Sequence, residues 1–382
     1  MVLYWTINQK KPWDLPSTDD NMASWRNFFA NLPLTLKSPL SAAQEQPGVE
    51  RQKAWGRRTG WQWKMGERQM LMRKLLAASA MSLVMAVAAN SAAQAAEPDS
   101  CKTIRMADVG WTDNTAQNGL FKNLVEPMGY EVKDDVLGLP IILEGLKNKD
   151  IDIFLDNWMP TNSSNVQPYL DEKSIDMLQA NLKDAPYGPV VPQYVADAGV
   201  KDAKDLAANA EKFESRFYGI EPGNDGNKLI QARIDDPAGG MEGWELVESS
   251  EQGMLVQADK AMKKGDWIIF LGWAPHPVMG KMPLHYLTGF EKEGFGLSNI
   301  QTLTRSGYSA ECGNVGKLIS NLEFKLEMES AIMETILGGK DGKAAAGDWL
   351  KANPGVLDAW LAGVTTFDGK EALPVVKAAL GL

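Results

Sequence analysis

Two hydrophobic segments of the chain each lead into a tryptophan that lies near an acidic residue. Residues 104–110 form the first segment, and Trp111 and Asp113 follow it ahead of apolar residues at helical spacing. The second segment, residues 151–155, leads through an aspartate to Trp158. Both predict a buried strand of an α/β fold. Because ligands bind in open α/β sheets beyond the carboxyl ends of the strands, we expect both tryptophans at one crevice.

A simpler interpretation of the first strand end stays open at this point. Trp111 is also consistent with an ordinary tryptophan at the edge of the core, and Asp113 with the N-cap of the following helix. The recurrence of the pattern at Trp158 favours a shared binding site.

The length of the chain and its proline-rich segments predict two lobes. A chain of 382 residues exceeds a typical single domain. Residues 181–193, rich in proline and glycine and containing Tyr187, are expected to make the first crossing into a second lobe. Residues 274–277 are expected to cross back. We therefore predict that lobe 1 comprises residues 96–183 and 285–382, and lobe 2 residues 184–284.

The second lobe contributes two further candidate binding residues. Trp273 lies at the carboxyl end of a predicted strand over residues 266–272. Asn224 lies in a glycine-containing loop that precedes a predicted helix, but acidic neighbours oppose an anion there and no nucleotide-binding spacing is present. Asn224 is therefore interpreted as a neutral hydrogen-bonding group, with an ordinary turn asparagine as the alternative.

Residues 70–95 have the organisation of a secretory signal peptide. Arg73 and Lys74 precede an apolar run over residues 75–89, and small residues up to Ala95 provide a cleavage site. The run is too short for a membrane span. We predict cleavage after Ala95 and export to the periplasm. Residues 1–69 would then be an upstream extension outside the fold; a cytoplasmic leader with a signal anchor is the alternative.

The cysteine and histidine content limits the cofactor chemistry. Cys101 and Cys312 are the two cysteines, and an even number in an oxidising compartment predicts one disulfide. Two cysteines cannot form a four-ligand structural zinc site, and His276 and His285 are the two histidines. No metal and no cofactor are expected.

The charge and the aromatic residues favour a small cationic ligand. A net charge of −10 argues against nucleic acid as a partner. Aromatic rings attract cations at about 0.5–2 kcal/mol per ring, and a quaternary ammonium group has no N–H to donate. One carboxylate, that of Asp113, could balance its charge. The candidate rings are Trp111, Trp158, Tyr187 and Trp273.

Several motifs in the chain resemble a known family. GWTDN, IFLDNWMPT, KDAPYGPVVP, GIEPGNDGN and IIFLGWAPHPV are similar to the periplasmic substrate-binding proteins of ABC importers for choline and glycine betaine, from about Cys101 to the C-terminus. The resemblance implies an α/β, type II periplasmic-binding-protein fold with two lobes, a hinge of two crossings and an interlobe ligand. It also implies a Cys101–Cys312 pair, and an aromatic box with two polar contacts made by Trp111, Asp113, Trp158, Tyr187, Asn224 and Trp273.

The polar residues of these motifs favour choline over glycine betaine. Glycine betaine carries a carboxylate, which requires cationic or N–H donors. The motifs contain Asp113, Asp156 and Asn224 but no arginine. We therefore predict a monomeric protein that captures choline by hinge closure and delivers it to an inner-membrane permease with its ATPase. A binding protein for glycine betaine or another quaternary ammonium compound is the alternative.

Two other functional classes, an exported enzyme and a sensing receptor subunit, are alternatives to transport. An exported enzyme that acts on choline or its esters would need a nucleophile, but the chain has no G-x-S-x-G elbow. His276 and His285 are interpreted as structural residues, so no enzymatic activity is expected. A receptor subunit that senses choline without import would share the same pocket.

Overall fold

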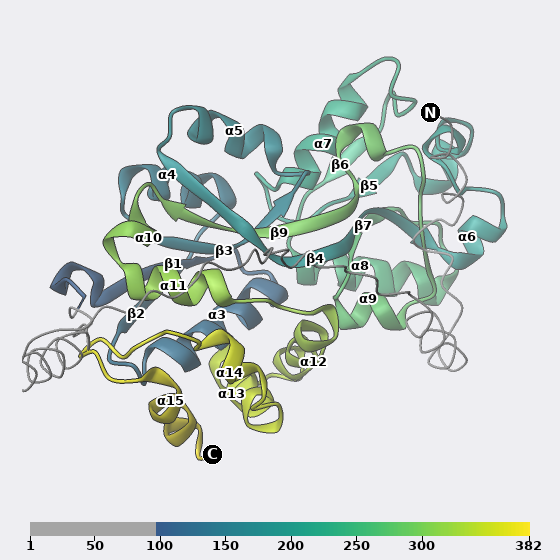
Figure 1. The fold of residues 1–382 in the computed structure, drawn as a ribbon. Coiled ribbons are helices and arrows are strands. Elements are labelled where there is room, and N and C mark those ends of the chain that lie inside the picture. The colour runs from purple at the N-terminus through teal and green to yellow at the C-terminus, as the bar shows by residue number, and fades with distance from the viewer. Residues whose placement is uncertain (1–96) are drawn as a thin grey trace, which may run out of the picture. The chain divides into compact units, whose positions relative to one another are not determined.

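The computed structural model describes residues 97–382 (Figure 1). The predicted extension over residues 1–69, the signal peptide over residues 70–95 and its cleavage site after Ala95 lie outside the described residues. Within residues 97–382, no helix combines the length and the apolar composition needed to cross a bilayer.

The first half of the fold consists of the two predicted strand–helix units and the strand after them. The elements are β1 (Thr103–Asp108), α3 (Thr112–Val125), β2 (Glu131–Val136), α4 (Leu139–Asn148) and β3 (Ile153–Met159). Strand β1 pairs in parallel with both β2 and β3, so the carboxyl ends of these strands point the same way. The expected shared edge of the sheet is therefore present.

The strands of residues 97–382 belong to one mixed sheet of nine strands in the order β2-β1-β3-β9-β4-β7-β5-β6, with β8 also paired to β4. Strand β4 (Ile175–Pro192) is its longest member, and β9 (Gly296–Arg305) runs antiparallel to it (Figure 1). The first part of β4 pairs with β9, and its last part pairs with β7 (Phe270–Trp273) and β8 (Leu284–Tyr286). These two long strands thus connect the halves of the sheet.

The second half of the fold contains strands β5 to β8 and the helices between β4 and β8. Strand β5 (Arg216–Tyr218) pairs in parallel with β6 (Glu245–Val247) and with β7. The predicted helix over residues 202–213 is instead a pair of 3-10 helices, because a capping box at Asp202 starts a short turn and left-handed Glu214 ends the segment. The helices of this half are α6 (Gln193–Asp197), η3 (Ala203–Asp205), η4 (Ala207–Phe213), α7 (Asp225–Asp235), α8 (Glu251–Lys264) and α9 (Pro277–Lys281). Helix α5 (Ser163–Asp171) precedes β4 and belongs to the first half.

Residues 274–277, which are predicted to cross back, are followed by residues that pair with the end of β4. After this proline-rich run the chain forms α9 and then β8, whose residues pair with the end of β4. Thr288 also donates its backbone N–H to the Lys201 carbonyl. The backbone of β8 therefore finds its hydrogen-bond partners on the last part of β4.

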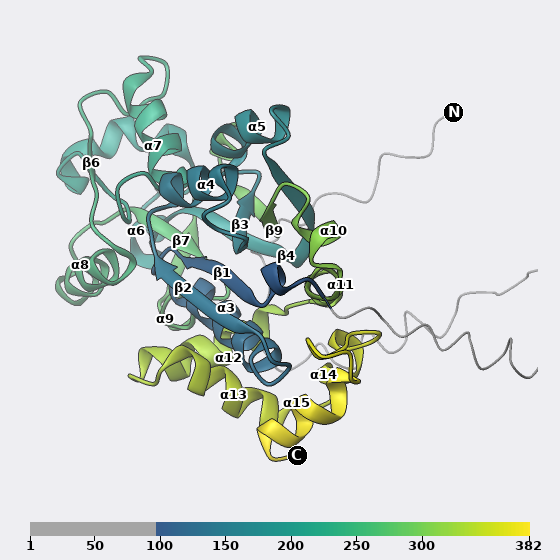
Figure 2. The same cartoon turned by 90° about the vertical axis from the view of Figure 1, so that its left-hand side faces the viewer.

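The C-terminal helices pack on the first half of the fold. They are α10 (Tyr308–Glu311), α11 (Gly313–Asn321), α12 (Leu326–Leu337), α13 (Gly342–Ala352), α14 (Val356–Trp360) and α15 (Ala372–Leu380). Figure 2 shows α12 and α13 beside α3. Gly119 of α3 lies so close to Gly342 that a Cβ atom there would be 2.5 Å from the Gly342 carbonyl oxygen. Glycine thus allows these two helices to approach closely.

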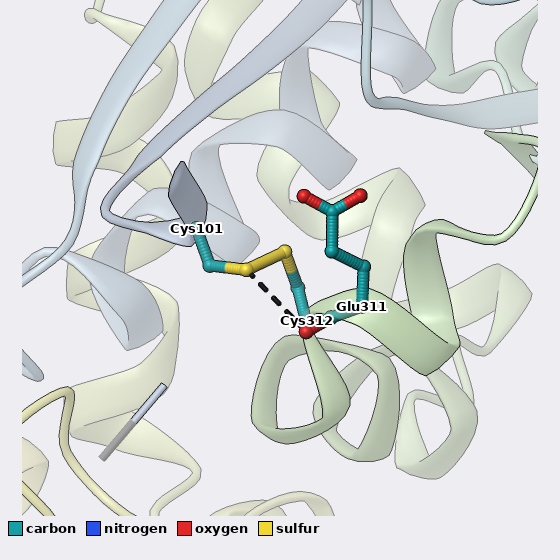
Figure 3. Close-up of side chains that lie close together, drawn as sticks. All are labelled: Cys101, Glu311 and Cys312. Carbon is teal, nitrogen blue, oxygen red and sulfur yellow. Dashed lines mark hydrogen bonds between the residues drawn. A yellow bond between two sulfur atoms is a disulfide. The ribbon is translucent and has the colours of Figure 1, made fainter. Parts of the chain in front are cut away.

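A disulfide and a cluster of ion pairs lie near β1, far along the sheet from β5 and β6. Cys101 and Cys312 form a disulfide between the residues that precede β1 and the start of α11 (Figure 3). Nearby, Asp152 is 2% exposed and accepts hydrogen bonds from the guanidinium groups of Arg105 and Arg305 at 2.7–2.9 Å. The disulfide and the ion pairs join β1 and β3 to the returning C-terminal segment.

Removal of the disulfide is expected to destabilise the protein. The bond closes a loop with a sequence separation of 211 residues, and such cross-links restrict the unfolded chain. The variant with both Cys101→Ala and Cys312→Ala should lose about 2–5 kcal/mol of unfolding free energy. Urea titration of both proteins measures this difference; equal midpoints and slopes would contradict the expectation.

Replacement of Asp152 is expected to destabilise the folded protein, because it leaves the guanidinium groups of Arg105 and Arg305 without their shared partner. Asp152→Ala should reduce the free energy of unfolding by about 3–5 kcal/mol. Burial raises the pKa of Asp152, but the hydrogen bonds from Arg105 and Arg305 outweigh it and lower the pKa overall. The stabilisation is therefore present near neutral pH and is lost in acid, as the pH falls through the lowered pKa. Urea unfolding at pH 7 and pH 3 tests this, with exposed Asp135→Ala as the matched control.

Candidate functional site

A cavity lies at the carboxyl ends of β1 and β3, against β4, β7 and the start of α7. All six residues predicted as binding residues line it. Ile220 and Asp225, which the sequence analysis did not select, also line it. The lining residues are Trp111, Asp113, Trp158, Tyr187, Ile220, Asn224, Asp225 and Trp273.

Tyr187 occupies the centre of the aromatic wall because of its position in β4. It pairs with Trp273 of β7 on one side and with Gly296 of β9 on the other. Its ring meets those of Trp158 and Trp273 edge-on, at centroid distances of 5.4 and 6.3 Å. Phe295 packs behind it at 5.4 Å. Edge-to-face packing of this kind holds each ring in one orientation.

The aromatic cage is formed by Trp111, Trp158, Tyr187 and Trp273. Each of its three tryptophans has a different environment at the indole nitrogen. Trp158 donates its indole N–H to Asp156, two residues earlier on the same strand, at 3.0 Å. Trp111 donates to both carboxylate oxygens of Glu221, at 3.1 Å. The indole N–H of Trp273 is buried and has no partner within residues 97–382.

Asp113 does not cap α3, so one of the two simple interpretations is wrong. Trp111 is the N-cap residue and makes no side-chain capping bond, while Asp113 lies in the first turn. One carboxylate oxygen of Asp113 accepts from the backbone N–H of Asn114 at 3.0 Å. The other oxygen is buried and has no partner within the described part of the chain. This free oxygen is available to a ligand in the cavity that the residue lines.

Asn224 both caps a helix and lines the cavity. Its side-chain oxygen accepts from the backbone N–H of Asn227, at the start of α7, at 3.0 Å. The hydroxyl of Tyr187 donates to the same oxygen at 3.4 Å, and the Asn224 amide donates to Asp225 at 3.0 Å. The capping interaction and the two side-chain contacts set the orientation of the amide at the cavity.

Asp225 is the functional candidate that sequence reasoning missed. It follows Asn224 directly, and its second carboxylate oxygen is buried without a partner among the described residues. The sequence signal was present, since Asp225 is one of the acidic neighbours of Asn224 that oppose an anion, but sequence alone does not tell whether its side chain points to the cavity or to solvent. Only the helical start of α7 turns it inward.

The carboxylates of Asp113 and Asp225 are the charged groups that line the cavity among the described residues. Burial, together with the charges of Asp156 and Glu251, raises the pKa of Asp113 well above its usual value. Burial likewise raises the pKa of Asp225, and it raises that of Glu221 to about 7. Among the described residues, no lysine or arginine lines the cavity. A monovalent cation is therefore the ligand charge that this environment stabilises best.

Several contacts join the two halves of the fold around the cavity. Glu251 of α8 accepts hydrogen bonds from the backbone N–H and the hydroxyl of Thr112, at the start of α3, the first at 2.9 Å. Glu251 also lies 3.2 Å from the buried imidazole of His276. Lys228 of α7 donates to Asn165 of α5 at 2.7 Å. The halves are thus held together over the cavity.

The disulfide region contains a group of side chains with metal-ligand chemistry, but it is not a metal site. Within residues 97–382, Cys101, Glu311 and Cys312 place potential ligand atoms close together (Figure 3). Both sulfur atoms are consumed by the disulfide. The Glu311 carboxylate accepts a hydrogen bond from Arg305 at 2.8 Å. Thiolate ligation, which a soft metal would need, is therefore not available here.

Solved structures of binding proteins resemble the chain closely. An ABC-transporter choline binding protein in complex with choline is 46% identical, with a TM-score of 0.72, and the match covers 75% of this chain and 100% of that one. Lactococcal OpuAC, in its closed-liganded conformation with glycine betaine, is 28% identical with a TM-score of 0.62, over 68% and 99% of the two chains. The predicted type II periplasmic-binding-protein fold is confirmed.

Sequence comparison gives the same result. The glycine betaine/carnitine transport binding protein GbuC of Listeria monocytogenes is 30% identical over 168 residues, which are 44% of this chain and 55% of that protein. Residues 102–352 match the family described as the substrate binding domain of ABC-type glycine betaine transport systems, and this match spans more than half of the chain. The chain therefore belongs to that family, and it is a substrate-binding protein of ABC-type transport.

Proposed function

We propose that the protein captures choline in the aromatic cavity and delivers it to an ABC import permease. The observation that carries the proposal is the composition of the cavity wall. Four aromatic residues surround the space together with Asp113 and Asp225, each with a buried carboxylate oxygen that has no hydrogen-bond partner among the described residues. Rings attract the trimethylammonium group, and the carboxylates balance its charge.

Each predicted binding residue has a role in this proposal. Trp111, Trp158, Tyr187 and Trp273 form the cage, and Asp113 provides the charge. Asn224 and Asp225 lie within reach of the remaining polar end of a ligand in the same cavity. The hydroxyl of choline can donate to a carboxylate or to an amide oxygen.

The cavity favours choline over glycine betaine for an electrostatic reason. Glycine betaine would bring its own carboxylate next to Asp113 and Asp225, whose pKa values are already raised by burial. Its carboxylate would find the indole N–H of Trp273 as a donor, but no guanidinium or ammonium group in the cavity wall. The choline-complexed relative, 46% identical, supports the same choice.

Capture is proposed to proceed by closure of two lobes. Lobe 1 would comprise residues 96–183 and 285–382, and lobe 2 residues 184–284. The pairing of residues 284–288 with β4 and Lys201 favours a second crossing within β9, slightly beyond this boundary. Strands β4 and β9 would then act as the two-stranded hinge.

The transport context follows from the family. Substrate-binding proteins of ABC importers work outside the cytoplasmic membrane, which suits a chain with a disulfide. We further propose that the chain is exported by the signal peptide over residues 70–95 with cleavage after Ala95, acts as a monomer in the periplasm, and delivers choline to an inner-membrane permease with its ATPase.

Direct titration tests the choice of ligand. Calorimetry should give micromolar or tighter binding of choline, which is about −8 kcal/mol or stronger, and weaker binding of glycine betaine. The physical reason is the acidic cavity without a basic residue. Tighter binding of glycine betaine would overturn the assignment, and the absence of binding by either compound would overturn the proposed function.

Replacement of a cage ring tests the proposed roles. Trp273→Ala removes one wall and should weaken choline binding at least tenfold, equivalent to about 1.4 kcal/mol. Trp349→Ala, on helix α13 and outside the cavity, is the matched control and should leave affinity unchanged. Tryptophan fluorescence during choline titration reports both results, and equal affinities in the two variants would remove Trp273 from the cage.

The charge of Asp113 is tested by an isosteric change. Asp113→Asn keeps the shape of the side chain but removes its negative charge, so choline binding should weaken by roughly tenfold or more. Glycine betaine, with no net charge, should lose much less. Competition titrations of both ligands measure the ratio of affinities, and an unchanged ratio would show that Asp113 does not select the cation.

A further inference from the structure

The hydrogen bond between Trp111 and Glu221 differs from the other contacts of the cage because it connects the two halves of the fold. Trp111 precedes α3 in the first half, whereas Glu221 lies between β5 and α7 in the second half. Both carboxylate oxygens lie 3.1 Å from the indole nitrogen. Trp158, by contrast, is held by Asp156 of its own strand. The orientation of Trp111 thus depends on the opposite half.

The backbone around Glu221 is itself fixed. The Glu221 carbonyl accepts from the backbone N–H of Asn224 at 3.2 Å and from the side-chain amide of Asn227 at 3.1 Å. Asn227 also donates to Glu248 at 3.0 Å. These hydrogen bonds hold the backbone of Glu221 in place within the second half. The Glu221 carboxylate can therefore reach the indole of Trp111 only when the two halves are together.

From this geometry we infer that Glu221 is a positioning residue that couples the orientation of the Trp111 ring to lobe closure. The inference rests on the proposed function, since it assigns Glu221 a role in that same site. Glu221 does not line the cavity and acts on the ligand through Trp111. Closure therefore fixes the orientation of the Trp111 ring and also brings the rings of the second lobe to the ligand.

The ionisation of Glu221 makes this coupling dependent on pH. Burial raises its pKa to about 7, and the nearby carboxylates of Asp225 in α7 and Glu251 in α8 act in the same direction, while the indole N–H of Trp111 opposes them. A cation held on Trp111 favours the ionised carboxylate. The liganded protein then binds fewer protons than the free one, so affinity for choline rises as the pH rises through 7.

The test measures choline dissociation constants by calorimetry at pH 6 and pH 8 for the wild-type chain and for Glu221→Gln. The wild-type constant should fall by about five- to tenfold between these pH values, whereas the variant should retain only the smaller change due to Asp113 and Asp225. At pH 8 the variant should bind choline roughly tenfold more weakly than the wild type. Equal pH profiles in the two proteins would overturn the inference.

A double-mutant cycle shows whether Glu221 acts through Trp111. Trp111→Phe keeps an aromatic wall but removes the indole N–H, so Glu221→Gln should cost much less in that background than in the wild type. Equal losses in both backgrounds would overturn the inference. If Glu221→Gln fails to fold, Trp111→Phe alone decides, because it should also flatten the pH profile.

The matched control is Glu248→Gln, which makes the same substitution next to the same loop but does not contact a cage ring. It should leave the choline dissociation constant and its pH profile unchanged. A loss equal to that of Glu221→Gln would assign the effect to the loop and overturn the inference. If the wild-type chain does not bind choline at all, the proposed function fails instead, so the two failures are distinguishable.

Discussion

The pairing of β4 with strands on both its edges is the constraint on which the rest of the structure depends. At Tyr187 the strand changes partners, from β9 alone to β9 and β7 together. This register brings Trp273 beside Tyr187 and leaves the Tyr187 ring in contact with Trp158. The same strand connects the two halves of the sheet. The aromatic cavity and the connection between the halves therefore follow from one set of backbone hydrogen bonds.

The buried carboxylates around the cavity lower the stability of the free protein and favour the binding of a cation. Asp113 and Asp225 are buried with a carboxylate oxygen that has no hydrogen-bond partner among the described residues, and the charges of Asp156 and Glu251 act on Asp113. Buried carboxylates without a counter-ion are costly. Part of that cost is relieved by raised pKa values, and a bound cation would relieve more of it. The protein thus keeps an unfavourable electrostatic environment that its ligand stabilises.

Contacts between the halves use acidic residues that lie next to the residues lining the cavity. Glu251 accepts hydrogen bonds at the start of α3, and Glu221 holds Trp111. Both carboxylates come from the second half and act on the first turn of one helix or the residue before it. Helix N-termini favour negative charge, so α3 is a natural recipient for a carboxylate from the opposite half. Closure and ligand orientation are for this reason expected to be energetically linked.

Local patterns in the sequence determined much of this protein. The alternation of strands and helices, the tryptophans at strand ends and the cysteine pair follow from hydrophobic periodicity and composition, and all six predicted binding residues line one cavity. The tertiary structure alone decided the pairing of β8 with β4, the inward direction of Asp225 and the partners Glu221 and Glu251. Periodicity describes the faces of a single element, whereas Glu221 and Glu251 contact residues 110 and 139 positions away, which only the tertiary structure brings together.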